Sequence, residues 1–302
     1  MSPIEGIFAA AIAPRRSSGH EIDLALLFEM IDFLCAKKVG GIALFGATGE
    51  YIHFGLEERI RVAQLVAKRS RVPLIVNASH SNLDGAVLLA DEAASAGAAG
   101  VLLMPPHFFR YSQLEVLEYY LEFAKTIQAD IPIYLYNVPF FTSEIAPETA
   151  CQLLGTGQFA GIKESSGRED YFAALMRQKE MTPFIRVIVG NDSLFTHGLL
   201  NGADGVISGV CCGLPELMLA LNRAIVESNA TKRDQLQALL VEYIGWLDRF
   251  PVPIGVRETV AMRGLEVGRQ AIPFSPASAK TMDEFREWFK EWLPELLLET
   301  KF

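Results

Sequence analysis

Eight short apolar segments recur along the 302-residue chain at a spacing of roughly 20 to 35 residues, and this repeat is the strongest constraint on the fold. Each segment is a nearly continuous apolar run, which is typical of strands buried on both faces of a parallel sheet. The predicted strands start near residues 6, 41, 73, 100, 131, 160, 185 and 205. Segments with helical periodicity lie between them, at residues 23–37, 56–69, 83–96 and 113–127. Strands and helices that alternate with this period indicate βα units.

Repeated βα units can build either an open, doubly wound sheet or a closed barrel. No G-x-G-x-x-G phosphate turn follows the first predicted strand, which weakens the doubly wound alternative. We therefore predict an α/β fold of the (β/α)8 TIM barrel type, an architecture that takes about 250 residues. The barrel with the active site is expected over residues 1–228, and a C-terminal helical extension over residues 229–302.

Beyond residue 213 the strand pattern stops, and helical segments follow at residues 214–228, 233–249, 254–264 and 279–298. The first of these would close the barrel. The last carries an apolar stripe, and Thr281 and Glu284 stand at the spacing of a capping box. The stripe is expected to pack in the core or in an interface. It consists of Met282, Phe285, Trp288, Phe289, Trp292, Leu293 and Leu296.

Charge and cysteine usage argue against several classes of function. With a net charge of −9, a pI near 5.2 and no cluster of Lys and Arg, the chain is expected to bind a small molecule and not nucleic acid. The N-terminal run GIFAAAIAP is too short to span a membrane and follows no basic segment, so neither a membrane span nor a signal peptide is predicted. The four cysteines show no zinc or disulfide spacing, which favours a cytoplasmic location. The five histidines form no pair at metal-ligand spacing, so no metal is expected.

Three side chains that can take part in a chemical reaction lie at predicted strand ends. Lys163 ends the sixth strand in FAGIKESSG, Tyr136 ends the fifth in YLYNVP, and Thr48 follows the second in LFGATGE. The C-terminal ends of barrel strands all open on one mouth, where loops build active sites. Because neighbouring strands lie about 4.8 Å apart, Tyr136 and Lys163 can point into the same cavity. We expect a lysine, a phenol and a hydroxyl to converge there.

This combination predicts imine chemistry. A desolvated lysine whose pKa falls from about 10.4 toward neutrality can attack a ketone, and the imine lets an adjacent bond break or form through an enamine. Tyr136 could move the protons, and Thr48 could hold its phenol by a hydrogen bond. Backbone amides of the GATGE turn, which includes Gly49, could receive a carboxylate. Taken singly, Lys163 could also be a solvated strand-end charge and Tyr136 a core tyrosine.

The motifs GATGE, YNVP and GIKESSG occur in this order, with PPHFFRYSQ between the first two. Together they resemble the dihydrodipicolinate synthase and N-acetylneuraminate lyase family of class I aldolases. The resemblance implies a barrel with a helical extension, commonly a homotetramer, that acts on pyruvate or another 2-oxo acid without a metal or organic cofactor. It implies that Lys163 forms the imine, that Tyr136 transfers protons and that Thr48 relays them. Gly190 and Ile207 fall where the family lines its pocket with backbone groups.

Three positions depart from the family pattern. Phe141 stands where the synthases usually carry an arginine for the second substrate's carboxylate, and a phenylalanine cannot make that charge-assisted contact. Ala47 stands where a hydroxyl usually precedes the relay threonine. Phe108 corresponds to the tyrosine that reaches a neighbouring subunit's site, which makes it a candidate interface or relay residue. We expect altered contacts to the second substrate's carboxylate and a shortened proton relay. Ala47, Gly49 and Phe141 are the substrate-binding candidates.

Three functional hypotheses follow. The leading one is a Schiff-base-forming lyase or aldolase that cleaves, condenses or dehydrates a 2-oxo acid, for example a 2-keto-3-deoxy sugar acid or a 4-hydroxy-2-oxo acid. The second is a 4-hydroxy-tetrahydrodipicolinate synthase of lysine biosynthesis with an unusual substrate grip. The third is a catalytically impaired barrel that binds 2-oxo acids, which Ala47 and Phe108 motivate. A homo-oligomer, either a dimer or a tetramer, is expected.

Overall fold

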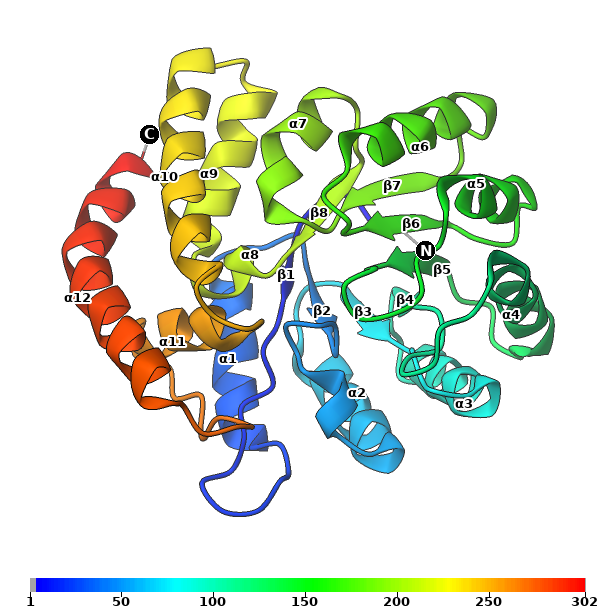
Figure 1. The fold of residues 1–302 in the computed structure, drawn as a ribbon, viewed down its shortest axis with the longest axis horizontal. Helices are drawn as coiled ribbons and strands as arrows, with labels where there is room; N and C mark the ends of the chain where they lie inside the picture. Colours follow the sequence, from blue (N-terminus) through cyan, green and yellow to red (C-terminus); the bar gives the residue numbers. More distant parts are fainter. Residues whose placement is uncertain (1–3, 302) are drawn as a thin grey trace.

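The computed structural model describes residues 4–301 and closes eight parallel strands into one barrel, with β8 paired back to β1 (Figure 1). The predicted (β/α)8 architecture is confirmed, and each strand begins within two residues of its predicted start. The strands are β1 (Gly6–Ala10), β2 (Gly41–Leu44), β3 (Leu74–Asn77), β4 (Gly100–Leu103), β5 (Ile133–Asn137), β6 (Gly161–Glu164), β7 (Arg186–Val189) and β8 (Gly205–Ser208).

Helices cover the outside of the barrel between successive strands (Figure 1). Polar caps determine where several of them begin, because they satisfy backbone N–H groups that lack a partner inside the helix. The Asp23 carboxylate accepts from the N–H of Ala25 at 3.0 Å, and the Asn82 side chain accepts from the N–H of Gly85 at 2.9 Å. These helices are α1 (Leu24–Ala36), α2 (Leu56–Arg69), α3 (Leu83–Ser95), α4 (Gln113–Thr126), α5 (Pro147–Gly155), α6 (Glu169–Met181) and α7 (Phe195–Leu200).

The chain after β8 is helical, and its last helix, α12, lies at the outer edge of the molecule against α9 and α10 (Figure 1). The predicted stripe on this helix packs inward, with Phe285 and Phe289 fully buried. The predicted capping box is wrong, because the helix begins earlier, after Ser275, and Thr281 donates to a carbonyl inside it. The helices are α8 (Val210–Gly213), α9 (Pro215–Val226), α10 (Ala230–Leu247), α11 (Ile254–Met262) and α12 (Pro276–Glu299).

Burial on both faces of the strands positions the site. Successive strand side chains point to opposite faces, so at the ends of β5 and β6 one pair faces the barrel axis and the next pair faces the helices. Tyr136 and Lys163 form the inward pair, and Asn137 and Glu164 the outward pair. All four are buried. No helix within residues 4–301 is long and apolar enough to cross a membrane.

Candidate active site

Tyr136 and Lys163 are register partners on β5 and β6, so their side chains leave the barrel wall side by side. The Lys163 Nζ atom lies 4.1 Å from the centroid of the Tyr136 ring. The two residues are only 2% and 3% exposed. Lys163 forms no ion pair with any residue of the described chain. This amine is therefore not committed to a carboxylate and is available to a ligand.

The pair opens into a cavity of about 410 Å³ at the C-terminal mouth of the barrel. Barrel enzymes build their active sites at this end from the loops that follow the strands. The structure brings most of the sequence-predicted residues together here, although they come from strands that are far apart in the sequence. The cavity is lined by Ala47, Thr48, Tyr136, Phe141, Lys163, Gly190 and Ile207.

Gly190, which follows β7, makes room for the lysine. A Cβ atom on this residue would lie 2.8 Å from Lys163 Cε, 2.9 Å from Lys163 Cγ and 2.0 Å from Ser165 Oγ. Real Cβ atoms do not approach other atoms so closely, so any side chain here would displace the lysine. The requirement for glycine is steric, because the backbone of Gly190 forms the surface along which Lys163 extends.

Thr48 lies in the cavity, but its hydroxyl is not bonded to the Tyr136 phenol in this structure. It faces the segment after β8, since a Cβ atom on Gly209 would lie 3.1 Å from Thr48 Oγ1 and 3.9 Å from Asp192 Oδ2. The expected Thr48–Tyr136 hydrogen bond is therefore not present among the described contacts. Thr48 is placed to meet a ligand from the β8 side of the mouth.

Two of the predicted residues lie outside the cavity lining. Gly49 packs behind it, where a Cβ atom would lie 3.0 Å from both the Ala11 carbonyl oxygen and the Phe45 nitrogen. Phe108 is 86% exposed and has a left-handed backbone with φ of 82°. Gly49 thus supports the turn through close packing, while the ring of Phe108 points away from this chain's own site.

Sequence reasoning missed two polar groups, Asp192 and Ser165. The Asp192 Oδ2 atom accepts from the backbone N–H of Val210 at 3.2 Å, but its Oδ1 atom is buried without a partner, and burial raises the pKa of this carboxyl. Ser165 Oγ is also buried without a partner. Both residues line the cavity. Their only sequence signal was their position directly after the sixth and seventh strands, in KESS and VGND.

The far wall of the cavity comes from the C-terminal helices, a contribution that the strand pattern could not reveal. Apolar side chains make up most of this wall, Asp248 at the end of α10 also belongs to it, and Phe141 extends the apolar surface from the loop after β5. Lys163 is the single cationic side chain among the described residues that line the cavity. The cavity therefore offers no second cation for a substrate carboxylate. The residues of the far wall are Ile244, Leu247, Asp248, Phe250, Val252 and Val256.

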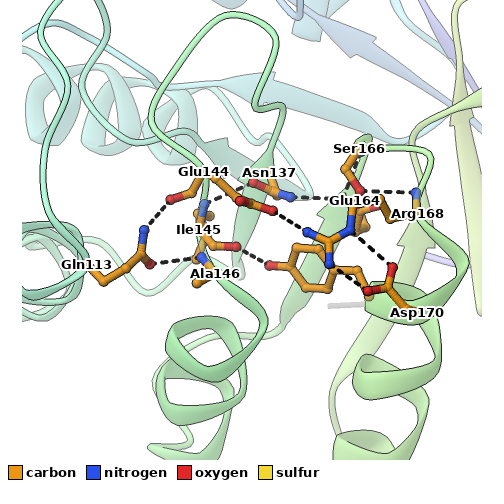
Figure 2. Close-up of polar contacts among 10 residues, drawn as sticks. Gln113, Asn137, Glu144, Ile145, Ala146, Glu164, Ser166, Arg168 and Asp170 are labelled. Carbon is orange, nitrogen blue, oxygen red and sulfur yellow. Dashed lines mark hydrogen bonds and ion pairs between the residues drawn. The ribbon is translucent and has the colours of Figure 1, made fainter.

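The outward pair on β5 and β6 anchors a hydrogen-bonded network behind the site (Figure 2). Asn137 Nδ2 donates to Glu164 Oε1 at 2.9 Å, and the backbone N–H of Ser166 donates to the same oxygen at 2.8 Å. Asn137 Oδ1 accepts from the backbone N–H of Ile145 at 3.0 Å. Burial raises the pKa of the Glu164 carboxyl, and its hydrogen bonds oppose that rise. The network ties the ends of both strands to the loops that follow them.

Arg168 extends this network toward the surface (Figure 2). Its guanidinium pairs with Glu144 at 3.0 Å and with Asp170 at 2.6 Å. Gln113, at the start of α4, donates to the Glu144 carbonyl at 2.8 Å and accepts from the backbone N–H of Ala146 at 2.8 Å. The loop after β5, which carries Phe141 into the cavity, is thereby held from α4 on one side and from the start of α6 on the other.

A closed (β/α)8 barrel with an uncommitted, buried lysine against a tyrosine ring at its mouth defines the protein as a barrel enzyme of the class I aldolase type. The Dihydrodipicolinate synthetase family matches residues 3–292, and the chain belongs to that family.

Named relatives support this placement. The 4-hydroxy-tetrahydrodipicolinate synthase of Methanothrix thermoacetophila is 29% identical over 283 residues, covering 93% of this chain and 95% of that protein. The solved dihydrodipicolinate synthase from Aquifex aeolicus has a TM-score of 0.88 at 26% identity, covering 96% of this chain and 98% of that chain. The solved 4-hydroxy-tetrahydrodipicolinate synthase of Methylacidiphilum fumariolicum has a TM-score of 0.87 at 26% identity, covering 98% and 99%. These likenesses span nearly the whole length of the barrel and its C-terminal helices.

Proposed function

We propose that Lys163 forms an imine with the ketone of pyruvate or another 2-oxo acid, and that the protein makes or breaks a bond through the resulting enamine. The observation that carries this proposal is the buried Lys163 Nζ atom lying 4.1 Å from the Tyr136 ring centroid without an ion-pair partner. The amine attacks the ketone carbon, the hydroxyl of the carbinolamine leaves as water, and a C–N double bond forms. Once the imine nitrogen is protonated, loss of a proton from the neighbouring carbon gives the enamine.

Tyr136 is the proposed proton-transfer group, because its ring contacts the lysine at which each of these steps takes place. Thr48 is proposed to contact the substrate or its leaving hydroxyl from the β8 side. Gly190 and Ile207 are proposed to line the 2-oxo acid with backbone groups. These roles follow from position in the cavity, and they remain predictions about this chain.

A second candidate is 4-hydroxy-tetrahydrodipicolinate synthase. The names of the curated relatives favour it more directly than they favour cleavage of a sugar acid. In that reaction the enamine of pyruvate would attack aspartate semialdehyde, whose carboxylate needs a partner. Phe141 is 52% exposed at the mouth and offers none, and Lys163 is the single cation among the described lining residues. The cavity chemistry therefore favours the broader lyase or aldolase proposal.

The third candidate, a barrel that binds 2-oxo acids without useful catalysis, rests on Ala47 and Phe108. Ala47 lines the cavity without a hydroxyl, and Phe108 points out of it. Against this candidate, Lys163, Tyr136 and Thr48 all line one cavity, an arrangement that a binding protein does not need. Cleavage of any 2-oxo acid that depends on Lys163 would eliminate it.

We also propose that the protein is a homo-oligomer, either a dimer or a tetramer. The loops after β4 and β5 are joined by a bridge between His107 and Thr142, and they present exposed aromatic side chains on one surface. Protein interfaces are enriched in such residues. Phe108, Phe109 and Phe140 are the most exposed of them, at 86%, 66% and 67%. A cytoplasmic location remains a prediction from cysteine usage.

Competition between aldehydes tests the proposed function. Purified protein would be given pyruvate with aspartate semialdehyde, with an uncharged hydroxyaldehyde or with an aliphatic aldehyde, and pyruvate loss would be measured. The reverse reaction would be followed as pyruvate release from 4-hydroxy-2-oxo acids. We expect turnover of an uncharged aldehyde that is absent in Lys163→Ala. Turnover of aspartate semialdehyde alone would establish the second candidate instead.

A further inference from the structure

A second cavity of about 230 Å³ adjoins the one that holds Lys163. Three residues, Ala47, Phe141 and Val252, line both cavities and mark where they meet. The small side chain of Ala47 leaves this boundary thin on the side of the GATGE turn. Tyr51 and His107 lie in the wall of the second cavity.

Tyr51 and His107 form a hydrogen-bonded pair across two loops. The Tyr51 hydroxyl lies 3.2 Å from His107 Nδ1, and the two rings meet edge to face with centroids 5.6 Å apart. Tyr51 sits on a short 3-10 turn after β2 and is 8% exposed, while His107 follows β4 and is half-buried. A proton can move from the buried Tyr51 hydroxyl to the His107 imidazole, because the two are hydrogen-bonded. The half-buried imidazole can then pass a proton toward the surface.

Arg59 makes this pair more suitable for proton transfer. Its guanidinium lies 4.9 Å from the centroid of the Tyr51 ring and is fixed by the carbonyls of Ser79, at 2.9 Å, and Asn77, at 2.6 Å. It has no carboxylate partner among the described residues. Burial raises the pKa of Tyr51 to about 12, and the positive charge of Arg59 opposes that rise. The guanidinium therefore stabilises the negative charge that develops on Tyr51 when its proton leaves.

His107 can accept the proton that Tyr51 gives up. Burial, with the charges of His80 and Arg59, lowers its pKa below the ordinary 6.5, so the ring is neutral at pH 7 and can accept a proton. Acceptance at Nδ1 requires the tautomer that carries its proton on Nε2. The titratable and charged groups around His107 are Tyr51, Arg59 and His80, and Glu50 and His53 line the same cavity.

Tyr136 needs a group that accepts the proton of its hydroxyl. It is 2% exposed, and it forms no side-chain hydrogen bond in the described chain, either with Thr48 or with another residue. A phenol can take a proton from the substrate only if its own proton leaves at the same time. Tyr136 lines the first cavity and Tyr51 the second, and the two cavities meet at the residues that they share.

We infer that Tyr51 and His107 are positioning residues that relay protons between Tyr136 and solvent, through water in the second cavity. This inference rests on the proposed imine chemistry. In enamine formation, one proton leaves the carbon next to the imine for the Tyr136 oxygen, and the C–H electron pair becomes the new C–C double bond while the iminium nitrogen regains its lone pair. The Tyr136 proton passes by water to Tyr51, and the Tyr51 proton passes to His107 Nδ1. His107 then releases one proton to solvent, so charge is balanced.

Hydrogen–deuterium exchange at the methyl group of pyruvate tests this relay without knowledge of the second substrate. Exchange in D2O would be followed by NMR, and borohydride trapping of the imine would be measured in the same samples. Tyr51→Phe keeps the ring beside Arg59 and removes only the hydroxyl. We expect it to trap the imine as the wild type does but to exchange about 10²-fold more slowly, at the lower end of the range for acid–base catalysis. Tyr134→Phe is the matched control, because the Tyr134 hydroxyl accepts from the backbone N–H of Ile4 at 3.3 Å and Tyr134 lines neither cavity.

A second variant, His107→Gln, keeps the proposal testable if Tyr51→Phe misfolds. Wild-type exchange should fall as the pH drops below about 6.5 and His107 is protonated, and this dependence should vanish in His107→Gln. The double variant should be no slower than the slower single variant, since both changes break one chain. Exchange in Tyr51→Phe within roughly twofold of Tyr134→Phe, with the imine trapped in both, would overturn the relay alone. Failure of the wild type to form any imine would instead overturn the proposed function and the relay with it.

Discussion

The two faces of β5 and β6 differ in how far their polar groups are satisfied, although they use adjacent residues of the same strands. The outward pair, Asn137 and Glu164, is joined by a hydrogen bond of 2.9 Å and tied to two further backbone groups. The inward pair, Tyr136 and Lys163, has the same register but no side-chain hydrogen bond within the described chain. Both pairs are buried.

This difference distinguishes the outward pair, which supports the structure, from the inward pair, which is proposed to react. Buried polar groups are normally hydrogen-bonded, so an unsatisfied pair in the middle of a well-bonded structure points to a ligand that completes it. The outward network holds the strand ends and both following loops, and the inward groups keep bonding capacity that the proposed substrate would use. Four substitutions, taken in order of expected effect, test this division.

Lys163→Ala should have the largest effect on activity. Without the amine no imine can form, so pyruvate-dependent turnover should fall below detection, while the barrel should stay folded because Lys163 contributes no ion pair. Turnover would be measured with the best aldehyde found, and folding by circular dichroism and thermal unfolding. Residual turnover at more than a trace of the wild-type level would assign the chemistry to another group.

Tyr136→Phe should come next. The ring that contacts Lys163 would remain, so imine trapping should persist, but the proton-transfer steps should slow by about 10² to 10⁴. Single-turnover rates would be compared with imine yield at equal pyruvate concentration. An equal loss of both quantities would show that Tyr136 acts in binding and not in proton transfer.

Gly190→Ala should test whether the backbone after β7 positions the lysine. The added methyl group would lie 2.8 Å from Lys163 Cε, so the amine must move, and kcat should fall by about 10- to 100-fold with its charge unchanged. Gly245→Ala on α10 is the matched control, because a Cβ atom there meets nothing within 4 Å. Similar kcat values for the two variants would refute the steric role of Gly190.

Glu164→Gln should have the smallest effect, which should appear as a change in how the free energy of unfolding depends on pH. Because the folded-state pKa of Glu164 is raised above its usual 4.5, its favourable contribution is fully present below pH 4.5 and is lost as the pH rises through the raised value. The free energy of unfolding of the wild type, measured in urea, should therefore fall relative to that of Glu164→Gln between about pH 4 and pH 8. Glu291→Gln, at an exposed position, should show no such trend. Parallel curves for all three proteins would contradict the assignment.

The sequence was sufficient for the parts of the molecule that depend on local pattern. Continuous apolar runs located every strand, and the position of Lys163 and Tyr136 at strand ends placed both in one cavity because barrel geometry is fixed once eight strands close. The start of α12 was misplaced for a local reason. Thr281 and Glu284 have capping-box spacing, but Ser275 followed by Pro276 provides the stronger start six residues earlier.

The rest of the site depends on contacts between distant segments, which no local pattern encodes. The wall formed by Ile244, Leu247 and Val256 exists only because α10 and α11 pack across the mouth. The closeness of Thr48 Oγ1 to Gly209 depends on how the loop after β2 meets the segment after β8. The pairing of Tyr51 with His107 joins residues 56 positions apart. These features are determined by tertiary packing and cannot be predicted from the periodicity of the strands.

Borohydride trapping tests the central claim most directly. The protein would be incubated with pyruvate and sodium borohydride, its intact mass measured and the modified peptide mapped, with Lys163→Ala as control. We predict one reduced pyruvyl adduct per chain on the peptide that contains Lys163, and none in the variant. A folded wild-type protein that gains no adduct from pyruvate or from longer 2-oxo acids, or that carries it on another lysine, would contradict imine formation at Lys163.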